Sequence, residues 1–341
     1  MDSVWPISSY SPVKPLFGLL IASAGWAQPL TEGVALSSLQ RPAGARALGL
    51  AGVYTAIANE PSGCFANPAA SAWLSERPQA AISVSLLGIG RVYSSLAYAQ
   101  SISQIVGVSA GLRSFSGGSF TARTSRGEPL GSYVPQDYAL ALGGAFRWDF
   151  FSVGVLGKYL WSGLLGGGIA GNGFAADLGA LFQVSNAVSI GAALSNLGGF
   201  IAWQGHRESL PLSIAVGVAT ELQLAPSTRR ERHPITGEET VVWIPSPQYL
   251  LISTEARYTQ GIARPSLLVA VEVAPLSGFS LRTGLTIVGD DAGRVRWFAL
   301  SQLGGGIGIQ MPPLTRPTLP PPAGLRPVVR LQQSLALDAQ H

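Results

Sequence analysis

The residue types that catalysis and cofactor binding need are present in this chain, but not at the required spacing. Gly166, Gly168 and Gly171 satisfy a G-x-G-x-x-G pattern, yet they lie between two predicted strands, whereas a dinucleotide site lies between a strand and a helix. His206 and His233 have no cysteine or carboxylate at ligand spacing, so no metal site is predicted. No nucleophile elbow or paired-acid motif stands out in the sequence. We therefore predict that the protein is not an enzyme and has no catalytic residues, metal or cofactor.

The charged residues are few, and their positions favour pairing over catalysis. They make up 12% of the 341 residues, against 47% hydrophobic residues. The charges within predicted strands fall on the face that carries small and polar residues: Arg113, Arg147, Lys158, Asp177, Glu221, Glu255, Arg257, Glu272, Arg282 and Arg296. We expect four of them, on neighbouring strands, to pair inside the fold, because burying such charges unpaired costs several kcal/mol each. These four are Glu255, Arg257, Glu272 and Arg282.

Hydrophobic residues recur at every second position along most of the chain, and this period predicts that β-strands position these charges. Phe151, Val153 and Val155, for example, alternate with smaller residues, which is typical of a strand and not of a helix. One face of the predicted strands is bulky, apolar and almost free of charge. About fourteen strands are expected, near 80–88, 91–101, 104–115, 137–148, 150–161, 173–183, 187–197, 211–224, 248–259, 266–274, 278–288, 294–302, 305–311 and 326–337.

A soluble sandwich would show the same alternation, but two further observations favour a transmembrane β-barrel. The first is an export signal, whose apolar core, Leu16 to Ala27, is too short for a membrane-spanning helix and ends in small residues before Gln28. The second is the length of the connections, which are short near 102, 149, 185 and 276 and long at 116–136, 162–172, 198–210 and 312–325. Aromatic residues near strand ends would form an interfacial girdle: Tyr133, Tyr138, Trp148, Tyr159, Trp161, Trp203 and Trp297.

One connection, 225–247, is long, charged and rich in proline where a short turn is expected. Three interpretations stay open for it: a solvated hairpin insertion, an error in the strand count, and a periplasmic docking loop. The end of the chain, Pro312 to His341, is proline-rich and lacks a terminal aromatic residue, so the sequence leaves open how the last strand closes the barrel.

The segment before the first predicted strand is too apolar for a free tail, and we expect it to fold inside the barrel. Asn67 and Pro68 form the N-cap and first turn of a short helix. Gly44, Gly49 and Gly52 permit close approach of the backbone to the barrel wall. The chain then divides into a signal peptide (1–27), an N-terminal periplasmic or hatch segment (28–78) and the transmembrane barrel (79–341).

The same segment carries a family resemblance. G-A-R-A-L-G-L-A-G at 44–52 and F-A-N-P-A at 65–69 resemble the N-terminal signature of the PorV/PorQ outer-membrane proteins, which are related in fold to the FadL fatty-acid transporters. The likeness continues through stretches such as 151–164, 174–182 and 265–285. It implies a fourteen-stranded barrel with an internal hatch at 44–74. The residues that match the signature are Gly44, Arg46, Gly49, Gly52, Asn67 and Pro68.

The resemblance implies a non-enzymatic protein of the outer membrane of a Gram-negative-type bacterium, with a role in type IX-like secretion or in binding another envelope protein. The alternative hypothesis is a FadL-like passive transporter of hydrophobic small molecules. A third hypothesis, an outer-membrane hydrolase, would require a serine and a histidine within reach of one another. The expected partners are outer-membrane lipid and secretion or other envelope proteins. Nucleic acid is not expected, because the net charge is only +4 and no basic cluster is interleaved with aromatic residues; the oligomeric state is left open.

Overall fold

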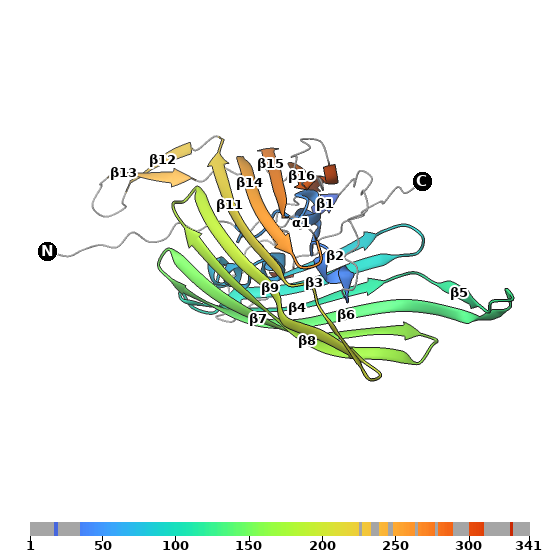
Figure 1. The fold of residues 1–341 in the computed structure, drawn as a ribbon. Helices are drawn as coiled ribbons and strands as arrows, with labels where there is room; N and C mark the ends of the chain where they lie inside the picture. The colour runs from blue at the N-terminus through green and yellow to red at the C-terminus, as the bar shows by residue number, and fades with distance from the viewer. Residues whose placement is uncertain are drawn as a thin grey trace, which may run out of the picture.

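The chain folds into a long, largely antiparallel sheet that carries a short segment with four short helices against one face (Figure 1). The computed structural model describes residues 17–19, 35–224, 227–232, 239–244, 248–262, 265–276, 279–288, 300–309 and 328–329. None of the helices in these ranges is long and apolar enough to cross a membrane.

From β2 to β17, each strand of the sheet pairs antiparallel with its neighbour, in the order β2-β3-β4-β6-β7-β8-β9-β11-β14-β15-β16-β17. Their sequences alternate, and many of their apolar residues are β-branched or aromatic, which suits a pleated surface. The strands are β2 Gln79–Leu86, β3 Val92–Ser101, β4 Val106–Ser116, β6 Pro129–Trp148, β7 Phe151–Leu165, β8 Ile169–Gln183, β9 Val188–Trp203, β11 Ser213–Gln223, β14 Tyr249–Thr259, β15 Ser266–Leu276, β16 Phe279–Val288 and β17 Leu300–Ile309. The prediction of an all-β, antiparallel fold is confirmed.

The segment 35–78, called the inner segment here, lies against one face of this sheet, which is the inner face. It comprises η1 (Ser37–Gln40), α1 (Ala45–Gly49), η2 (Pro61–Phe65) and η3 (Pro68–Trp73). Helix α1 contacts both β2 and β17, which lie at opposite ends of the strand order, and η3 contacts β3, β4, β6, β7 and β8 between them. One small segment can touch both ends and the middle of a sheet only if the sheet curls around it.

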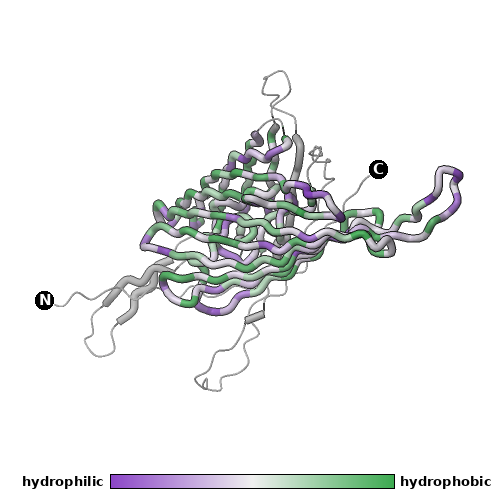
Figure 2. Tube along the Cα trace, turned by 60° about the horizontal axis from the view of Figure 1, so that its bottom comes forward, coloured by the Kyte–Doolittle hydropathy of each residue, from purple (hydrophilic) through white to green (hydrophobic). Residues whose placement is uncertain are grey.

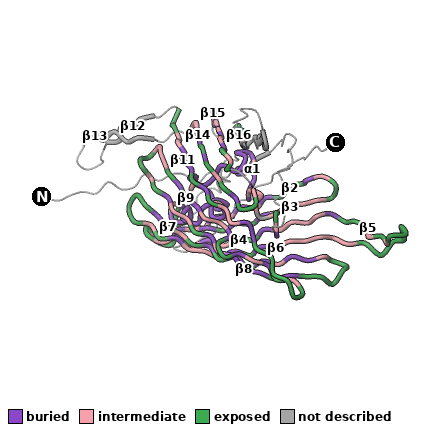
Figure 3. Tube along the Cα trace, in the orientation of Figure 1, coloured by how far each residue is buried: buried purple, intermediate pink, exposed green. Residues whose placement is uncertain are grey.

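The two faces of the sheet differ as the alternation predicts. Along β7, Ser152, Leu156 and Lys158 are buried on the inner face, whereas Val153 and Val155 are exposed on the outer face. Figure 3 shows this alternation of buried and exposed residues along the strands, and Figure 2 shows the alternation of hydropathy. A broad exposed apolar face is typical of a sheet that meets lipid.

Several aromatic side chains form a band on the outer face across β6, β7, β8 and β9. Tyr138 contacts Trp161, Tyr159 contacts Phe174, and Phe174 contacts Phe200, with ring centroids 5.5, 5.4 and 6.5 Å apart. Tyr138, Tyr159 and Trp161 lie within β6 and β7 and not at their ends, because these strands are longer than the sequence indicates. Such a band has the arrangement that an interfacial girdle requires. Trp297 lies outside the described residues.

The predicted long connection 162–172 is wrong, and those at 116–136 and 198–210 are shorter than predicted, because the strands continue to pair where loops were expected. Strand β5 (Phe120–Arg123) pairs with β6 inside 116–136, and β10 (His206–Ser209) pairs with β9 inside 198–210. At 162–172 only a three-residue turn separates β7 from β8. Gly166 and Gly168 adopt positive φ angles of 91° and 65° there, so their role in the G-x-G-x-x-G pattern is to form a turn. The segment 312–325 lies outside the described residues.

The short connections after β3, β6, β8 and β15 are confirmed. The long connection 225–247 contains β12 (Ser227–Arg232) and β13 (Glu239–Ile244), which pair only with each other among the described strands. Its interpretation as a hairpin insertion is therefore confirmed, whereas its docking role stays a prediction. Figure 1 shows this hairpin at the end of the sheet opposite to β5.

The predicted strands at the end of the chain need correction. The strands expected at 294–302 and 305–311 are one strand, β17, because the glycines at 304–306 continue the ladder with β16 instead of forming a turn; residues 294–299 lie outside the described part. Of the strand expected at 326–337, the structure describes only β18 (Val328–Val329), which pairs with β2 in parallel and not antiparallel. At the other end of the sheet, β1 (Phe17–Leu19) pairs with β17. The described pairings thus do not join β2 to β17.

Candidate functional site

The backbone of the inner segment lies directly on glycines of the sheet. A Cβ atom added to Gly154 of β7 would lie 2.5 Å from the backbone nitrogen of Ala69. The same addition to Gly107 of β4 or Gly284 of β16 would bring it within 2.4 Å of the backbone of Ser71 or Leu50, respectively. Real Cβ atoms do not come so close to backbone atoms. The inner segment can therefore lie at this distance from the strands only if these three positions are glycine.

An ion-pair cluster joins α1 to β15 and β16. Arg46 Nε lies 2.7 Å from Glu272 Oε2, and Arg282 Nε lies 3.0 Å from Glu272 Oε1. The hydroxyl of Tyr249 donates a hydrogen bond of 2.7 Å to Glu272 Oε1. Glu272 is fully buried, so its charge is compensated by two guanidinium groups and a phenol. Burial has the largest single effect on the pKa of Arg46 and lowers it, but the charge of Glu272, together with smaller effects of Tyr54, Tyr249 and Glu60, raises this pKa to well above its usual value.

A second carboxylate of the sheet holds the centre of the inner segment. Glu255 Oε2 accepts hydrogen bonds from the backbone nitrogens of Tyr54 and Thr55 at 3.1 and 3.0 Å. Its other oxygen accepts from Arg257 Nε at 3.0 Å, and Arg257 Nη2 donates to the carbonyl oxygen of Gly52 at 2.8 Å. Glu255 and Arg257 therefore bind the inner segment as well as each other.

The four strand charges singled out in the sequence thus lie in two adjacent pairs, Glu255 with Arg257 and Glu272 with Arg282. The sequence did not indicate that both pairs bind the inner segment. Arg46 enters the cluster from 226 residues away in sequence. Gly52, with a positive φ of 84°, turns the chain beside Arg257, whereas Gly44 lies against Ser62 of the inner segment itself, and Gly49 is buried in α1.

Asn67 and Pro68 begin η3, as the sequence predicts, although η3 is a 3-10 helix. The Asn67 side chain accepts a hydrogen bond from the nitrogen of Ala69, as an N-cap does. Its amide nitrogen donates to the carbonyl oxygens of Thr55 and Ala180, at 2.8 and 2.9 Å. Asn67 therefore links two parts of the inner segment to β8.

A third polar cluster lies on β7, β8 and β9. Lys158 Nζ lies 2.6 Å from Asp177 Oδ1 and donates to Asn196 Oδ1. The backbone nitrogen of Asn196 donates to Asp177 Oδ1 at 2.7 Å, and the φ angle of Asn196 is 62°. The pairing of β8 with β9 is irregular beside this residue. The sequence marked Lys158 and Asp177 as inward charges but had no signal for the irregular pairing.

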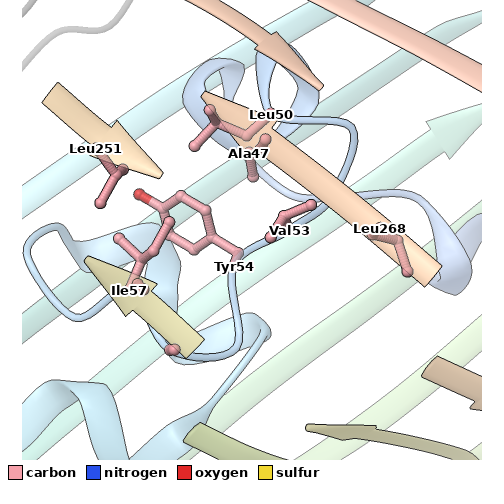
Figure 4. Close-up of a cluster of buried hydrophobic side chains, with 10 residues drawn as sticks. Ala47, Leu50, Val53, Tyr54, Ile57, Leu251 and Leu268 are labelled. Atoms are coloured by element: carbon pink, nitrogen blue, oxygen red, sulfur yellow. The ribbon is translucent and has the colours of Figure 1, made fainter. Parts of the chain in front are cut away.

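Apolar contacts complete the attachment of the inner segment. Leu50, Val53, Tyr54 and Ile57 form one buried cluster with Leu251 of β14 and Leu268 of β15 (Figure 4). These six residues are at most 3% exposed. Burial of each such side chain contributes roughly 1.5–3 kcal/mol.

Cys64 reports on whether the inner segment is in place. The side chain is 1% exposed and packs with Phe65, Ala97 and Leu156. Burial raises the pKa of the Cys64 thiol to about 12. Because the thiolate is the reactive form, Cys64 is both inaccessible and protonated while the inner segment is docked.

A cavity of about 130 Å³ separates part of the inner segment from the sheet. Its floor includes Pro42 and Thr55, and its walls come from the start of β11, the end of β14 and the start of β15, as well as from β4. These strand ends adjoin the connections opposite to the β12–β13 hairpin. Arg113 of β4 and Arg257 of β14 line the same cavity although five strands lie between theirs in the sheet, because the sheet is curled.

The histidines take no part in this site. His206 is exposed in β10, and His233 lies outside the described residues. Among the residues that the structure describes, no group of three or more His, Cys, Asp or Glu could hold a metal ion.

No family model and no curated protein matches the chain. Among solved structures, it is similar to the toluene transporter TbuX of Ralstonia pickettii, with a TM-score of 0.38 and 14% identity over 78% of this chain and 97% of that chain. It is also similar to the toluene transporter TodX of P. putida, with a TM-score of 0.38 and 13% identity over 78% of this chain and 96% of that chain.

Proposed function

We propose that this protein is an outer-membrane β-barrel that takes up small molecules passively through a cavity above its inner segment. The observation that carries the proposal is the cavity itself, which lies between the inner segment and the strands near one end of the sheet. The exposed apolar outer face supports a place in lipid. The glycine contacts and buried ion pairs fix the floor of the cavity.

The volume of the cavity limits the size of the molecule that it can hold. An apolar cavity of about 150 Å³ in another protein holds one benzene molecule. A volume of about 130 Å³ therefore suits a single ring or a short chain, and not a folded peptide. Phe65, Ile262 and Leu268 supply apolar lining for such a molecule.

We expect that filling the cavity abolishes uptake. Ala215 of β11 lines the cavity and is buried, so Ala215→Trp places an indole ring in the space that the molecule needs. Saturable uptake of radiolabelled toluene or benzoate is measured in cells that carry the full chain in their outer membrane. Uptake by the variant is expected to fall to the level of cells without the protein.

The matched control is Ala256→Trp on β14. Ala256 is exposed on the outer face and pairs with Val216, one residue from Ala215. This variant is expected to keep wild-type uptake. Equal uptake by wild-type cells and by cells without the protein, for both probes, would refute the proposed transport.

A second candidate function is the secretion-associated role that the PorV/PorQ resemblance implies. The β12–β13 hairpin favours it, because this insertion stands apart from the main sheet at the end opposite to the cavity. A hairpin with free edges can bind an extended strand of another envelope protein.

Replacing residues 227–244 by a short Gly-Ser linker tests this role. We expect the protein to remain folded in the membrane and to keep its uptake, whereas export of secreted proteins to the medium of the native strain falls. Unchanged export, with the variant present at the wild-type level, would exclude the hairpin as the docking element.

A further inference from the structure

We infer that the outer face of the sheet carries a binding site for the phosphate group of an outer-leaflet lipid, formed by Arg207 of β10 and flanked by Asn172 of β8. The inference rests on the proposed place of the protein in an outer membrane, and not on the proposed uptake.

One row of side chains, called the boundary row here, marks where the apolar surface of the outer face ends. Its members lie opposite one another in the strand register from β6 to β10: Tyr138, Trp161, Asn172, Ala202 and Arg207. The next row, on the side of the β12–β13 hairpin, is entirely apolar or aromatic from β6 to β9: Leu140, Tyr159, Phe174 and Phe200. The outer face therefore changes character at the boundary row.

The tyrosines beside the boundary row donate their hydroxyls to polar partners. Tyr138 donates to Gln136 Oε1, and Tyr159 donates to Asn172 Oδ1, both at 2.7 Å. Aromatic rings with an apolar body and a hydrogen-bonded polar end are typical of the level of the lipid headgroups.

The distance to the other end of the apolar surface agrees with this level. At that end, Trp148 lies opposite Phe151, and Phe151 lies opposite Phe182. From Phe151 to Trp161, β7 rises about 34 Å, which is about 26 Å along a barrel axis at a usual tilt of about 40°. The apolar band of an outer-membrane barrel is about 25 Å tall. The boundary row thus lies at the headgroups of the leaflet on the side of β5 and β10.

Arg207 is the cation of the boundary row. It is exposed, and its guanidinium lies 3.5 Å from the centre of the Phe200 ring. Stacking uses the flat face of a guanidinium and leaves the N–H donors at its edge available. Among the described residues, no carboxylate forms an ion pair with Arg207. The adjacent Glu208 lies opposite Ile201, which is buried on the inner face.

A lipid phosphate fits this arrangement of charge and apolar surface. A guanidinium binds two phosphate oxygens through parallel N–H donors, and lipid phosphates lie at the level of the boundary row. Because Asn172 Oδ1 accepts from Tyr159, the amide nitrogen of Asn172 is a further donor in the same row. Phe174, which is 58% exposed, offers aromatic surface to the acyl chains of the same lipid. A neutral lipid would not compensate the charge of Arg207, and a free anion would not contact the apolar row.

Binding of lipid A and of dephosphorylated lipid A, which has the same acyl chains, tests the inference. Native mass spectrometry of the purified full-length protein in a neutral detergent measures the fraction that retains each lipid. We expect the wild type to bind lipid A about tenfold or more tightly than the dephosphorylated form, because charge-assisted hydrogen bonds are lost with the phosphate. Arg207→Gln is expected to bind the two lipids equally, and Arg207→Lys to keep part of the preference. Asn172→Ala is expected to weaken lipid A binding by about threefold.

The matched control is Arg123→Gln. Arg123 of β5 is exposed at the same end of the sheet but beyond the boundary row, and its guanidinium donates to the carbonyl oxygen of Gly127. This variant is expected to bind lipid A as the wild type does. An equal loss in Arg123→Gln and Arg207→Gln would mean attraction by net charge and would overturn the site.

The wild type alone also decides the inference, whether or not a variant folds. Equal affinity for the two lipids, or failure of both to bind, would overturn the phosphate site. Displacement of lipid A by inorganic phosphate at equal concentration would overturn a lipid as the ligand. None of these results bears on the proposed uptake, which the cell assay with toluene judges separately and in which Arg207→Gln is expected to behave as the wild type.

Discussion

Replacing Glu272 by glutamine is expected to release α1 from the sheet. The substitution keeps the size of the side chain but removes the negative charge that Arg46 and Arg282 share. Both arginines are almost fully buried, so their charges are left without a carboxylate partner in this cluster. Breaking a buried pair in this way costs about 3–5 kcal/mol. Since every 1.4 kcal/mol is about tenfold in an equilibrium, the population of protein with the inner segment displaced is expected to rise roughly a hundredfold or more.

The measurement is the rate at which a maleimide alkylates Cys64 in the folded protein, together with the midpoint of urea unfolding. The control is Glu221→Gln, because Glu221 of β11 is half-buried and accepts a hydrogen bond from Gln223. The control is expected to alkylate at the wild-type rate. If Glu272→Gln also keeps both the wild-type rate and the wild-type midpoint, the cluster does not hold the inner segment.

The second large effect is expected from Gly154→Leu. Even a Cβ atom at this position of β7 would lie 2.5 Å from the backbone nitrogen of Ala69, and leucine adds three further carbons. Because the clash is with backbone at the start of η3, the helix must move away from the sheet. Overpacking of a core costs about 1–3 kcal/mol, and we expect an effect at the upper end of that range. Alkylation of Cys64 is expected to accelerate.

Gly157→Leu on the same strand is the matched control. Gly157 is exposed on the outer face, and a Cβ atom there would lie 3.8 Å from the carbonyl oxygen of Leu142, which is ordinary contact. In lipid, an added leucine at this position is favourable. Equal alkylation rates in the two variants would mean that η3 does not rest on β7.

The two-residue period predicted the faces of the strands because it depends on local geometry alone. Lys158 lies on the inner face and Val155 on the outer face, as the alternation indicates. The same period placed Gly154 on the inner face. Its position in the alternation could therefore have predicted that it contacts the inner segment. The predicted end of β7 and the predicted start of β8 are wrong, because backbone pairing continues to Leu164 and Ile169, where the apolar alternation has faded.

The site required information that no local pattern contains. The contact between Arg46 and Glu272 joins residues 226 apart in sequence, and it exists only because the inner segment folds back against the curled sheet. Arg113 and Arg257 meet in one cavity for the same reason. The sequence therefore predicted which charges point inward but not which of them bind the inner segment.

The inner segment is docked within the curled sheet, and we propose that the outer face of that sheet meets lipid. The most direct measurement is alkylation of Cys64 by a membrane-permeant maleimide in intact outer membranes that contain the wild-type protein. Docking predicts that Cys64 remains unmodified at neutral pH, because the thiol is buried and its pKa is raised to about 12, and that it reacts fully after unfolding in denaturant. Rapid alkylation of Cys64 in the intact membrane would contradict the docked arrangement.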